Sequence, residues 1–188
     1  MPSDSKTELD VIAMSEGAVS METLKISLFE ELDKLALREF LVAAWTEAHE
    51  ADFGEELTKQ LVARLDSDDL GGVIPASDGQ LYLAKIGENI IGSLACALRG
   101  EVVYIWACYL ANDYQSKGLG RRVLKHALFA YATDLVACVH VLEGSQDARQ
   151  FYKKLGFIDC EATKFEVVSG KSTPARIMQA RIRNLKLD

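Results

Sequence analysis

The stretch NDYQSKGLGRRVLKHALFAYA, from Asn112 to Ala132, joins a polar turn to a run of residues with helical periodicity. Gly118 and Gly120 lie in the turn. From Arg121 onward, apolar residues recur at helical spacing, which predicts an amphipathic helix of about four turns. The segment before the turn, EVVYIWACYL (101–110), is apolar without alternation, which is typical of a strand buried on both faces.

A buried strand, a glycine turn and a helix in this order form a geometry suited to phosphate groups. The first amides of a helix have no intrahelical partners, and the helix dipole adds partial positive charge there. Lys117 and Arg121 could add full charges. A dinucleotide fingerprint would need a glycine at Val123, and a P-loop would need Gly-Lys followed by Ser or Thr. Taken alone, the turn is equally compatible with a plain bend and no ligand.

The rest of the chain reads as β-α-α-β-β-β-α-β-α-β-β. We therefore expect an α/β protein (α+β type) with a mixed, mostly antiparallel central sheet of about six to seven strands flanked by helices. Residues 1–22 lack convincing periodicity and are expected to be a tail or an irregular extension, and residues 23–188 to be one domain. The expected elements are strands at 23–29, 80–86, 90–98, 101–110, 135–142, 157–168 and 174–184, and helices at 30–52, 55–67, 121–132 and 145–155.

Composition excludes several classes of protein. The formal net charge of −7 argues against a nucleic-acid partner, which usually needs a basic face. No apolar run is long enough to span a bilayer, and the first twenty residues do not resemble a secretory signal, so we expect a cytoplasmic protein without a membrane partner. The four cysteines and three histidines show no metal-ligand spacing, so we expect neither a metal site nor a disulfide framework.

Two motifs resemble signatures of the GNAT N-acetyltransferase superfamily. QSKGLG (115–120) matches the family pattern Q/R-x-x-G-x-G/A, and SQDARQFYKKLGF (145–157) resembles its second signature, A-x-x-x-Y-x-K-x-G-F. One helix and one strand separate them, as in the family, and the resemblance covers roughly residues 23–183. The sequence departs mildly from the family at four positions: Asn112 for Pro, Gln115 for the frequent Arg, Ser116 for Gly, and Ser145 for Asn.

The resemblance implies that acetyl-CoA is the co-substrate and that no metal takes part. Its pyrophosphate would lie on the backbone amides of the turn, and its pantetheine arm would run along the end of the central strand, in a splay between that strand and 135–142. The implied cofactor-binding residues are Cys108, Tyr109, Leu110, Gln115, Ser116, Lys117, Gly118, Leu119, Gly120, Arg121 and Ser145. A strand amide near Leu110 would polarise the thioester carbonyl. Tyr152 matches the general acid that protonates the leaving thiolate.

The general base stays open among Glu101, Glu143 and a water chain relayed by Tyr104. His140 lies within an apolar strand and is expected to be a core residue. By resemblance, the acceptor site would be built from the first two helices, the central strand and the late hairpin. Its candidate wall residues are Trp45, His49, Glu50, Asp52, Phe53, Tyr104 and Trp106, of which Trp45 also lies on the apolar stripe of its helix.

The expected function is N-acetyl transfer from acetyl-CoA to a primary amine of a small molecule or peptide, by direct attack without a covalent enzyme intermediate. One alternative is a catalytically silent CoA-binding sensor or partner module, and another is a nucleotide-binding α/β domain. A homodimer is also in question, since PARIMQARI (174–182) reads either as a sheet edge that pairs with a second copy or as an internal strand.

Overall fold

The computed structural model of this chain describes residues 9–15 and 18–188. Its strands are β1 (Leu9–Ser15), β2 (Ala18–Leu28), β3 (Gly79–Ile86), β4 (Asn89–Arg99), β5 (Val102–Leu110), β6 (Val136–Leu142), β7 (Ile158–Val168) and β8 (Lys171–Arg181). Its α-helices are α1 (Lys34–Ala63), α2 (Leu119–Leu128) and α3 (Gln146–Leu155). The described part of the chain therefore contains all seven expected strands and one more.

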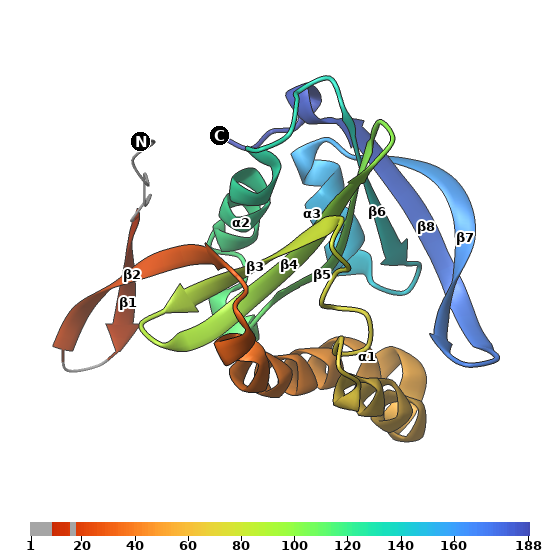
Figure 1. Cartoon of the computed structure of the whole chain (residues 1–188), viewed down its shortest axis with the longest axis horizontal. Coiled ribbons are helices and arrows are strands. Elements are labelled where there is room, and N and C mark those ends of the chain that lie inside the picture. Colours follow the sequence, from red (N-terminus) through yellow and green to blue (C-terminus); the bar gives the residue numbers. More distant parts are fainter. Residues whose placement is uncertain (1–8, 16–17) are drawn as a thin grey trace.

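The eight strands form one sheet in the order β1-β2-β3-β4-β5-β6-β8-β7. Every neighbouring pair is antiparallel except β5 and β6, which are parallel and connected through α2. Figure 1 shows α1 on one side of the sheet and α2 and α3 on the other. The mixed, mostly antiparallel sheet flanked by helices confirms the expected fold class.

Two clusters of buried side chains hold these layers together. The first joins α2 and α3 to one face of the sheet and includes Leu124, which is fully buried. The second joins α1 to the opposite face and includes Leu41, also fully buried. Because each helix presents an apolar stripe to the sheet, the packing fixes which face of each helix is turned toward the strands.

The N-terminal segment differs from its expected form. Strand β1 and the first part of β2 fall within residues 1–22, which were expected to form a tail or an irregular extension. These strands pair with each other, and β2 also pairs with β3. Residues 1–8 and 16–17 of that segment lie outside the described residues. The division of the chain at residue 22 stays a prediction.

The helices also differ in detail from the expected ones. The two helices expected at 30–52 and 55–67 are confirmed as the two halves of α1, which Gly54 separates at the expected place with non-helical φ 75° and ψ 164°. Helix α2 spans ten residues and ends at Leu128, so it is shorter than the expected four turns. No helix in the described part of the chain is long and apolar enough to cross a membrane.

The structure decides between the two alternatives for one strand and corrects an expectation about another. Strand β8, which contains PARIMQARI, pairs with both β6 and β7, so it is an internal strand and not a sheet edge. His140 is exposed between the buried residues Val139 and Val141. Since side chains alternate along a strand, His140 points to the face that α2 and α3 do not cover. The apolar residues around it in the sequence hid this alternation.

Candidate functional site

The turn before α2 has the backbone geometry expected for a phosphate-binding loop. Gly118 is the N-cap residue of α2 and has a left-handed conformation, with φ 77° and ψ −1°. A Cβ atom built on Gly118 would meet no atom within 4 Å, so the space beside this backbone is open. Glycine is needed for the positive φ, and the absence of a side chain leaves room for a ligand.

The amides of this turn are free to bind an anion. Within the described part of the chain, no backbone N–H of residues 116–121 donates a hydrogen bond to another protein group. The first amide to do so is that of Arg122, which donates to the Gly118 carbonyl at 3.2 Å. Six successive free donors at the start of a helix can bind an anionic group, because the helix dipole favours negative charge at the same place.

Gly120 adds a packing contact to the free amide that it contributes to this turn. A Cβ atom at this position would lie 3.3 Å from the ring of Phe151, which belongs to α3. The missing side chain of Gly120 therefore lets α2 pack closely against α3. This contact ties the loop to the helix that carries the second signature.

The other predicted loop residues contribute in different ways. Leu119 is buried in the core, so only its backbone can face a ligand. The Gln115 amide group donates hydrogen bonds to the Leu110 carbonyl and to Asn112 Oδ1, both at 2.9 Å, and so holds the loop at the end of β5. Lys117 Nζ lies 5.7 Å from the centre of the Tyr114 ring. Ser116 and Arg121 are exposed beside the free amides.

Ser145 occupies the N-cap position of α3, as expected, but its hydroxyl makes no capping hydrogen bond. Its backbone instead closes the connection from β6, since its N–H donates to the Leu142 carbonyl at 3.1 Å. The hydroxyl therefore has no structural role as a cap.

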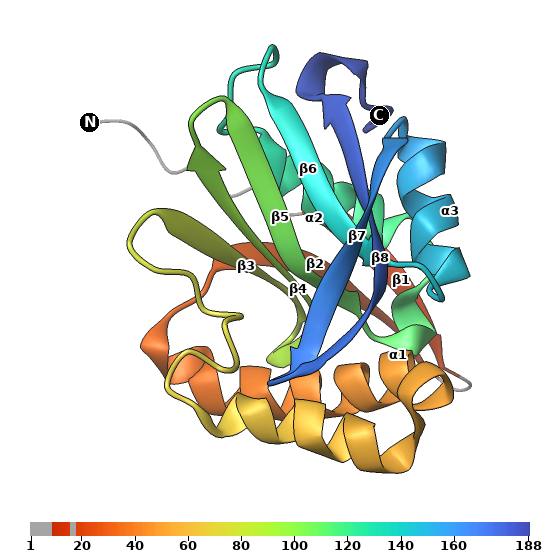
Figure 2. The same ribbon diagram turned by 90° about the vertical axis from the view of Figure 1, so that its right-hand side faces the viewer.

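The end of β5 leaves its neighbour β6, as the resemblance implied. The parallel pairing of the two strands runs only from Val102↔Val136 to Ile105↔Val139. Beyond it, β5 stays paired with β4, whereas β6 stays paired with β8. Figure 2 shows the two strands within the sheet, with β7 and β8 beyond β6. The second half of β5 therefore has an edge that no described strand covers.

A β-bulge in β5 accompanies this separation. The register of β4 and β5 shifts between Ser93 and Ala95, and Ala107 has a positive φ of 50°. Ser93, buried on β4, donates its hydroxyl hydrogen bond to the Ala107 carbonyl at 2.8 Å. A positive φ in a residue other than glycine is strained, and such strain is characteristic of functional sites.

Tyr152 lies beside the uncovered part of β5, at the gap that opens where β5 separates from β6. It contacts one of the predicted residues of β5. Its side chain is 7% exposed and packs edge-on against Phe151 and Phe157, and its hydroxyl lies beside the Cys108 thiol. Burial, together with the neighbouring Cys108, raises the pKa of Tyr152 well above its ordinary value of about 10. The hydroxyl therefore stays protonated at neutral pH and can donate its proton.

Cys108 is not prepared to act as a nucleophile. Burial raises the pKa of its thiol, and the hydrogen bond from Tyr152 offsets only part of that effect. Because the thiolate is the reactive form of cysteine, a neutral buried thiol reacts slowly. Among the described residues, no group of three His, Cys, Asp or Glu side chains could hold a metal ion.

The candidates for the general base lie at different distances from the gap. Glu101 lies at the opposite end of β5 from Leu110, about 30 Å of extended strand away, so it does not reach the gap. Glu143 is exposed just after β6, at the same end as the gap. Tyr104 is 36% exposed, on the part of β5 that pairs with β6.

The acceptor-wall candidates divide into packing residues and residues near the gap. Trp45 is buried in the cluster under α1, which confirms its packing role, and Trp106 is tied to the α1–β3 connection because its Nε1–H donates to the Gly72 carbonyl at 2.9 Å. His49 lies next to the end of β5, where its Nε2 is 3.2 Å from the hydroxyl oxygen of Tyr109. Glu50 and Asp52 are exposed.

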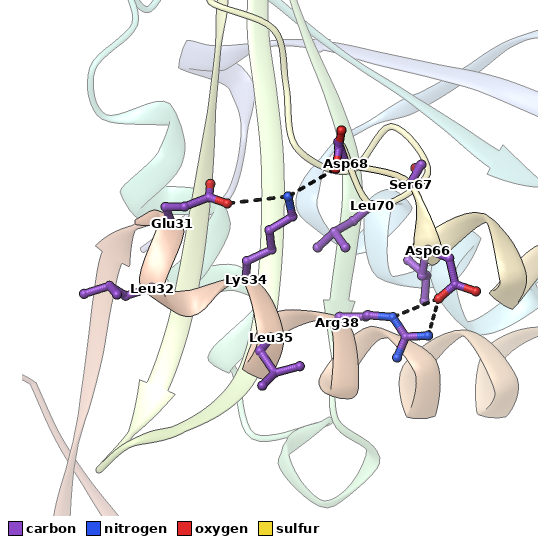
Figure 3. A pocket seen from close by; sticks show the side chains of 10 residues that line it. Glu31, Leu32, Lys34, Leu35, Arg38, Asp66, Ser67, Asp68 and Leu70 are labelled. Carbon is purple, nitrogen blue, oxygen red and sulfur yellow. Dashed lines mark hydrogen bonds and ion pairs between the residues drawn. The ribbon is translucent and has the colours of Figure 1, made fainter.

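Two hollows on the surface lie away from Tyr152 and the loop 115–121, although Glu50 lines one of them. One, shown in Figure 3, lies beside the first turns of α1 and is lined in part by Glu31, Lys34 and Asp68, with Lys34 forming ion pairs to both carboxylates. The other is lined by residues from both halves of α1, before and after the break at Gly54. Neither contains Tyr152 or a residue of the loop 115–121, and solvated ion pairs account for their polar linings.

The family model described as "Acetyltransferase (GNAT) family" matches residues 35–157. The chain therefore belongs to the GNAT acetyltransferase family, and it is an acyltransferase with acetyl-CoA as its co-substrate. No curated protein matches its sequence.

Solved structures of acetyltransferases share the fold. The PaiA N-acetyltransferase from Thermoplasma acidophilum, in complex with coenzyme A, has a TM-score of 0.71 at 19% identity, with 84% of this chain and 98% of that chain covered. The ribosomal-protein-S18-alanine N-acetyltransferase from Escherichia coli has a TM-score of 0.59 at 18% identity, with 85% and 94% covered. Aminoglycoside 6'-acetyltransferase type Ii has a TM-score of 0.57 at 15% identity, with 84% and 96% covered.

Proposed function

We propose that this chain transfers the acetyl group of acetyl-CoA to a primary amine of a small molecule or peptide, and that the amine attacks the thioester directly. The observation that carries the proposal is the position of the Tyr152 hydroxyl, beside Cys108 at the gap where β5 leaves β6. A protonated phenol at that gap can supply the proton that the leaving CoA sulfur needs.

The residues of this chain would have separate roles in binding acetyl-CoA and in the reaction. The free amides of residues 116–121 would hold the pyrophosphate, with Lys117 and Arg121 adding charge. The backbone of Cys108, Tyr109 and Leu110 would position the pantetheine arm along the uncovered edge of β5. A strand amide near Leu110 would bind the carbonyl oxygen as negative charge develops on it. Tyr152 would then protonate the sulfur as the C–S bond breaks.

Direct attack is the favoured route because the one thiol at the gap is neutral. Cys108 would have to lose its proton before it could accept the acetyl group, and both burial and the absence of a described basic partner oppose that. A free amine needs no such activation once it has lost its own proton. The proposed reaction therefore forms one C–N bond and breaks one C–S bond within a complex of all three components.

We place the reaction in the cytoplasm, as the sequence predicts. All four cysteines are free, which fits a reducing compartment. A homodimer also stays a prediction, and since β8 is internal, the strand available at that edge of the sheet is β7.

A panel of amines tests the proposed function. We expect acetyl-CoA alone to yield little free CoA, and a subset of polyamines, aminoglycosides and peptides with free amino groups to stimulate CoA release. The assay follows the CoA thiol with a colorimetric reagent and the acetylated amine by mass spectrometry. Tight acetyl-CoA binding without release in the presence of any amine would instead identify a silent CoA-binding module.

A further inference from the structure

His49 is a buried side chain whose hydrogen-bonding capacity is only half used. It lies on α1 and is 9% exposed. Its Nε2 lies 3.2 Å from the hydroxyl oxygen of Tyr109, and its ring stacks on Phe53 with the centroids 5.3 Å apart. Its Nδ1 has no hydrogen-bond partner among the described residues. A buried polar atom without a partner is costly, and such atoms in native proteins call for an explanation.

The bulge in β5 brings Tyr109 to this histidine. Trp106 and Ala107 are consecutive, yet both pack toward α1. After them the alternation resumes with opposite parity, so that Cys108 faces α2 and α3 while Tyr109 faces α1. Without the bulge, Tyr109 would point to the same face as Ile105 and could not meet His49.

The same bulge sets two tyrosine hydroxyl groups on either side of the uncovered part of β5. Tyr152 reaches it from the α3 side through Cys108, and Tyr109 reaches it from the α1 side. A reacting thioester at the end of β5 would thus have a proton donor on one side and a tyrosine–histidine pair on the other.

We propose that Tyr109 and His49 together accept the proton that the attacking amine releases, with Tyr109 in contact with the amine and His49 acting through it. This inference rests on the proposed function, because it supplies the base that acetyl transfer to an amine requires. None of the base candidates expected from the sequence includes this pair.

The proton transfers balance as follows. As the amine nitrogen bonds to the acetyl carbon, its acidity rises and it gives one proton to the Tyr109 oxygen. Tyr109 passes its own proton to His49 Nε2, which requires the tautomer with a proton on Nδ1. The C–S bond breaks, and the sulfur takes the Tyr152 proton. The imidazolium of His49 and the deprotonated Tyr152 then return to their starting states by exchange with water.

The surroundings of His49 keep its imidazole neutral and ready to accept. Burial lowers the pKa of His49, and the carboxylate of Asp52 on the same helix opposes that effect in part. The titratable groups that face it among the described residues are Tyr109 from β5 and Asp52 from α1. The connection from β6 to α3 presents Gly144 to the Asp52 carboxylate, and its charged residue, Glu143, is exposed.

Replacing His49 with Gln tests the inference through the pH dependence of the rate. In the wild-type enzyme, kcat/KM falls with decreasing pH as the amine is protonated, and it falls more steeply, by about one further unit of slope, below the pKa of His49. We expect His49→Gln to lower kcat at least about tenfold and to remove the steeper limb. Tyr109→Phe should lower kcat similarly, and the double variant should be no slower than the slower single variant, because the two residues act as a unit.

His126→Gln is the matched control. The His126 ring also packs edge-on against the ring of a tyrosine, Tyr82, with the ring centroids 5.5 Å apart. However, His126 belongs to α2 and lies away from the gap. The His126→Gln variant should keep the wild-type kcat and the steeper limb of the pH profile of kcat/KM. If His49→Gln does not fold, the kcat of Tyr109→Phe tests the proposal, and a lowered value supports it.

A folded His49→Gln enzyme that binds acetyl-CoA normally and keeps the wild-type kcat and steeper limb would overturn the inference alone. An unchanged kcat in Tyr109→Phe would do the same. A wild-type enzyme that turns over no amine would overturn the proposed function as well.

Discussion

Replacing Tyr152 with Phe should lower kcat by two to three orders of magnitude (roughly 10²–10³-fold) and leave acetyl-CoA binding almost unchanged. The substitution removes only the hydroxyl that meets Cys108, while the ring keeps its contacts with Phe151 and Phe157. The thiolate must then leave without a proton. Steady-state kinetics with a saturating amine, together with calorimetric titration of acetyl-CoA, separates the two effects.

Tyr131→Phe is the matched control for this prediction. Tyr131 also places its hydroxyl beside a cysteine thiol, at 3.5 Å from Cys96 Sγ, but the pair lies away from the uncovered part of β5. Both variants lose a comparable hydroxyl–thiol contact, so their free energies of unfolding should fall by similar amounts. If Tyr152→Phe and Tyr131→Phe retain equal kcat values, Tyr152 has no role as the acid.

The second large effect concerns the loop before α2. Gly118→Val should weaken acetyl-CoA binding on the order of 10²-fold, equivalent to about 2.7 kcal/mol. A branched side chain at φ 77° forces the backbone out of its left-handed conformation, and its atoms would also fill the open space beside the free amides. Isothermal titration calorimetry with acetyl-CoA measures the change.

Gly100→Val isolates the contribution of backbone strain. Gly100 has φ 63° and open space around its Cβ position, but it lies in the turn between β4 and β5, far from the loop. Both variants should lose about 1–2 kcal/mol of stability. Only Gly118→Val should lose affinity for acetyl-CoA, and an equal loss in both would show that the effect is not local to the loop.

The parts of the fold that sequence could predict are those with a local signal. Gly54 marks the break in α1, and Gly118 marks the start of α2, because each has a positive φ that glycine adopts without strain. The two signatures predicted the loop and Tyr152, and the structure brings both to the same end of β5. Seven strands could be placed from short apolar or alternating runs separated by turn residues.

The remaining features depend on contacts between distant segments. The bulge at Ala107 has no mark in the apolar run 101–110, so the sequence could not tell that Tyr109 and Cys108 face opposite sides. The pairing of His49 with Tyr109 joins residues sixty positions apart. The close packing of Gly120 against Phe151 could not be predicted either, because Phe151 lies on another helix. The internal position of β8 follows from the order of the strands, which no single strand encodes.

Release of CoA with and without an amine is the most direct measurement of the central claim. The enzyme is mixed rapidly with acetyl-CoA, and free thiol is followed before and after an active amine from the panel is added. Before the amine is added, we predict no burst of CoA equal in amount to the enzyme. After the amine is added, we predict that one CoA is released for each acetylated amine. A burst of CoA without amine, with acetylated Cys108 found by mass spectrometry, would contradict direct attack across the gap between β5 and β6.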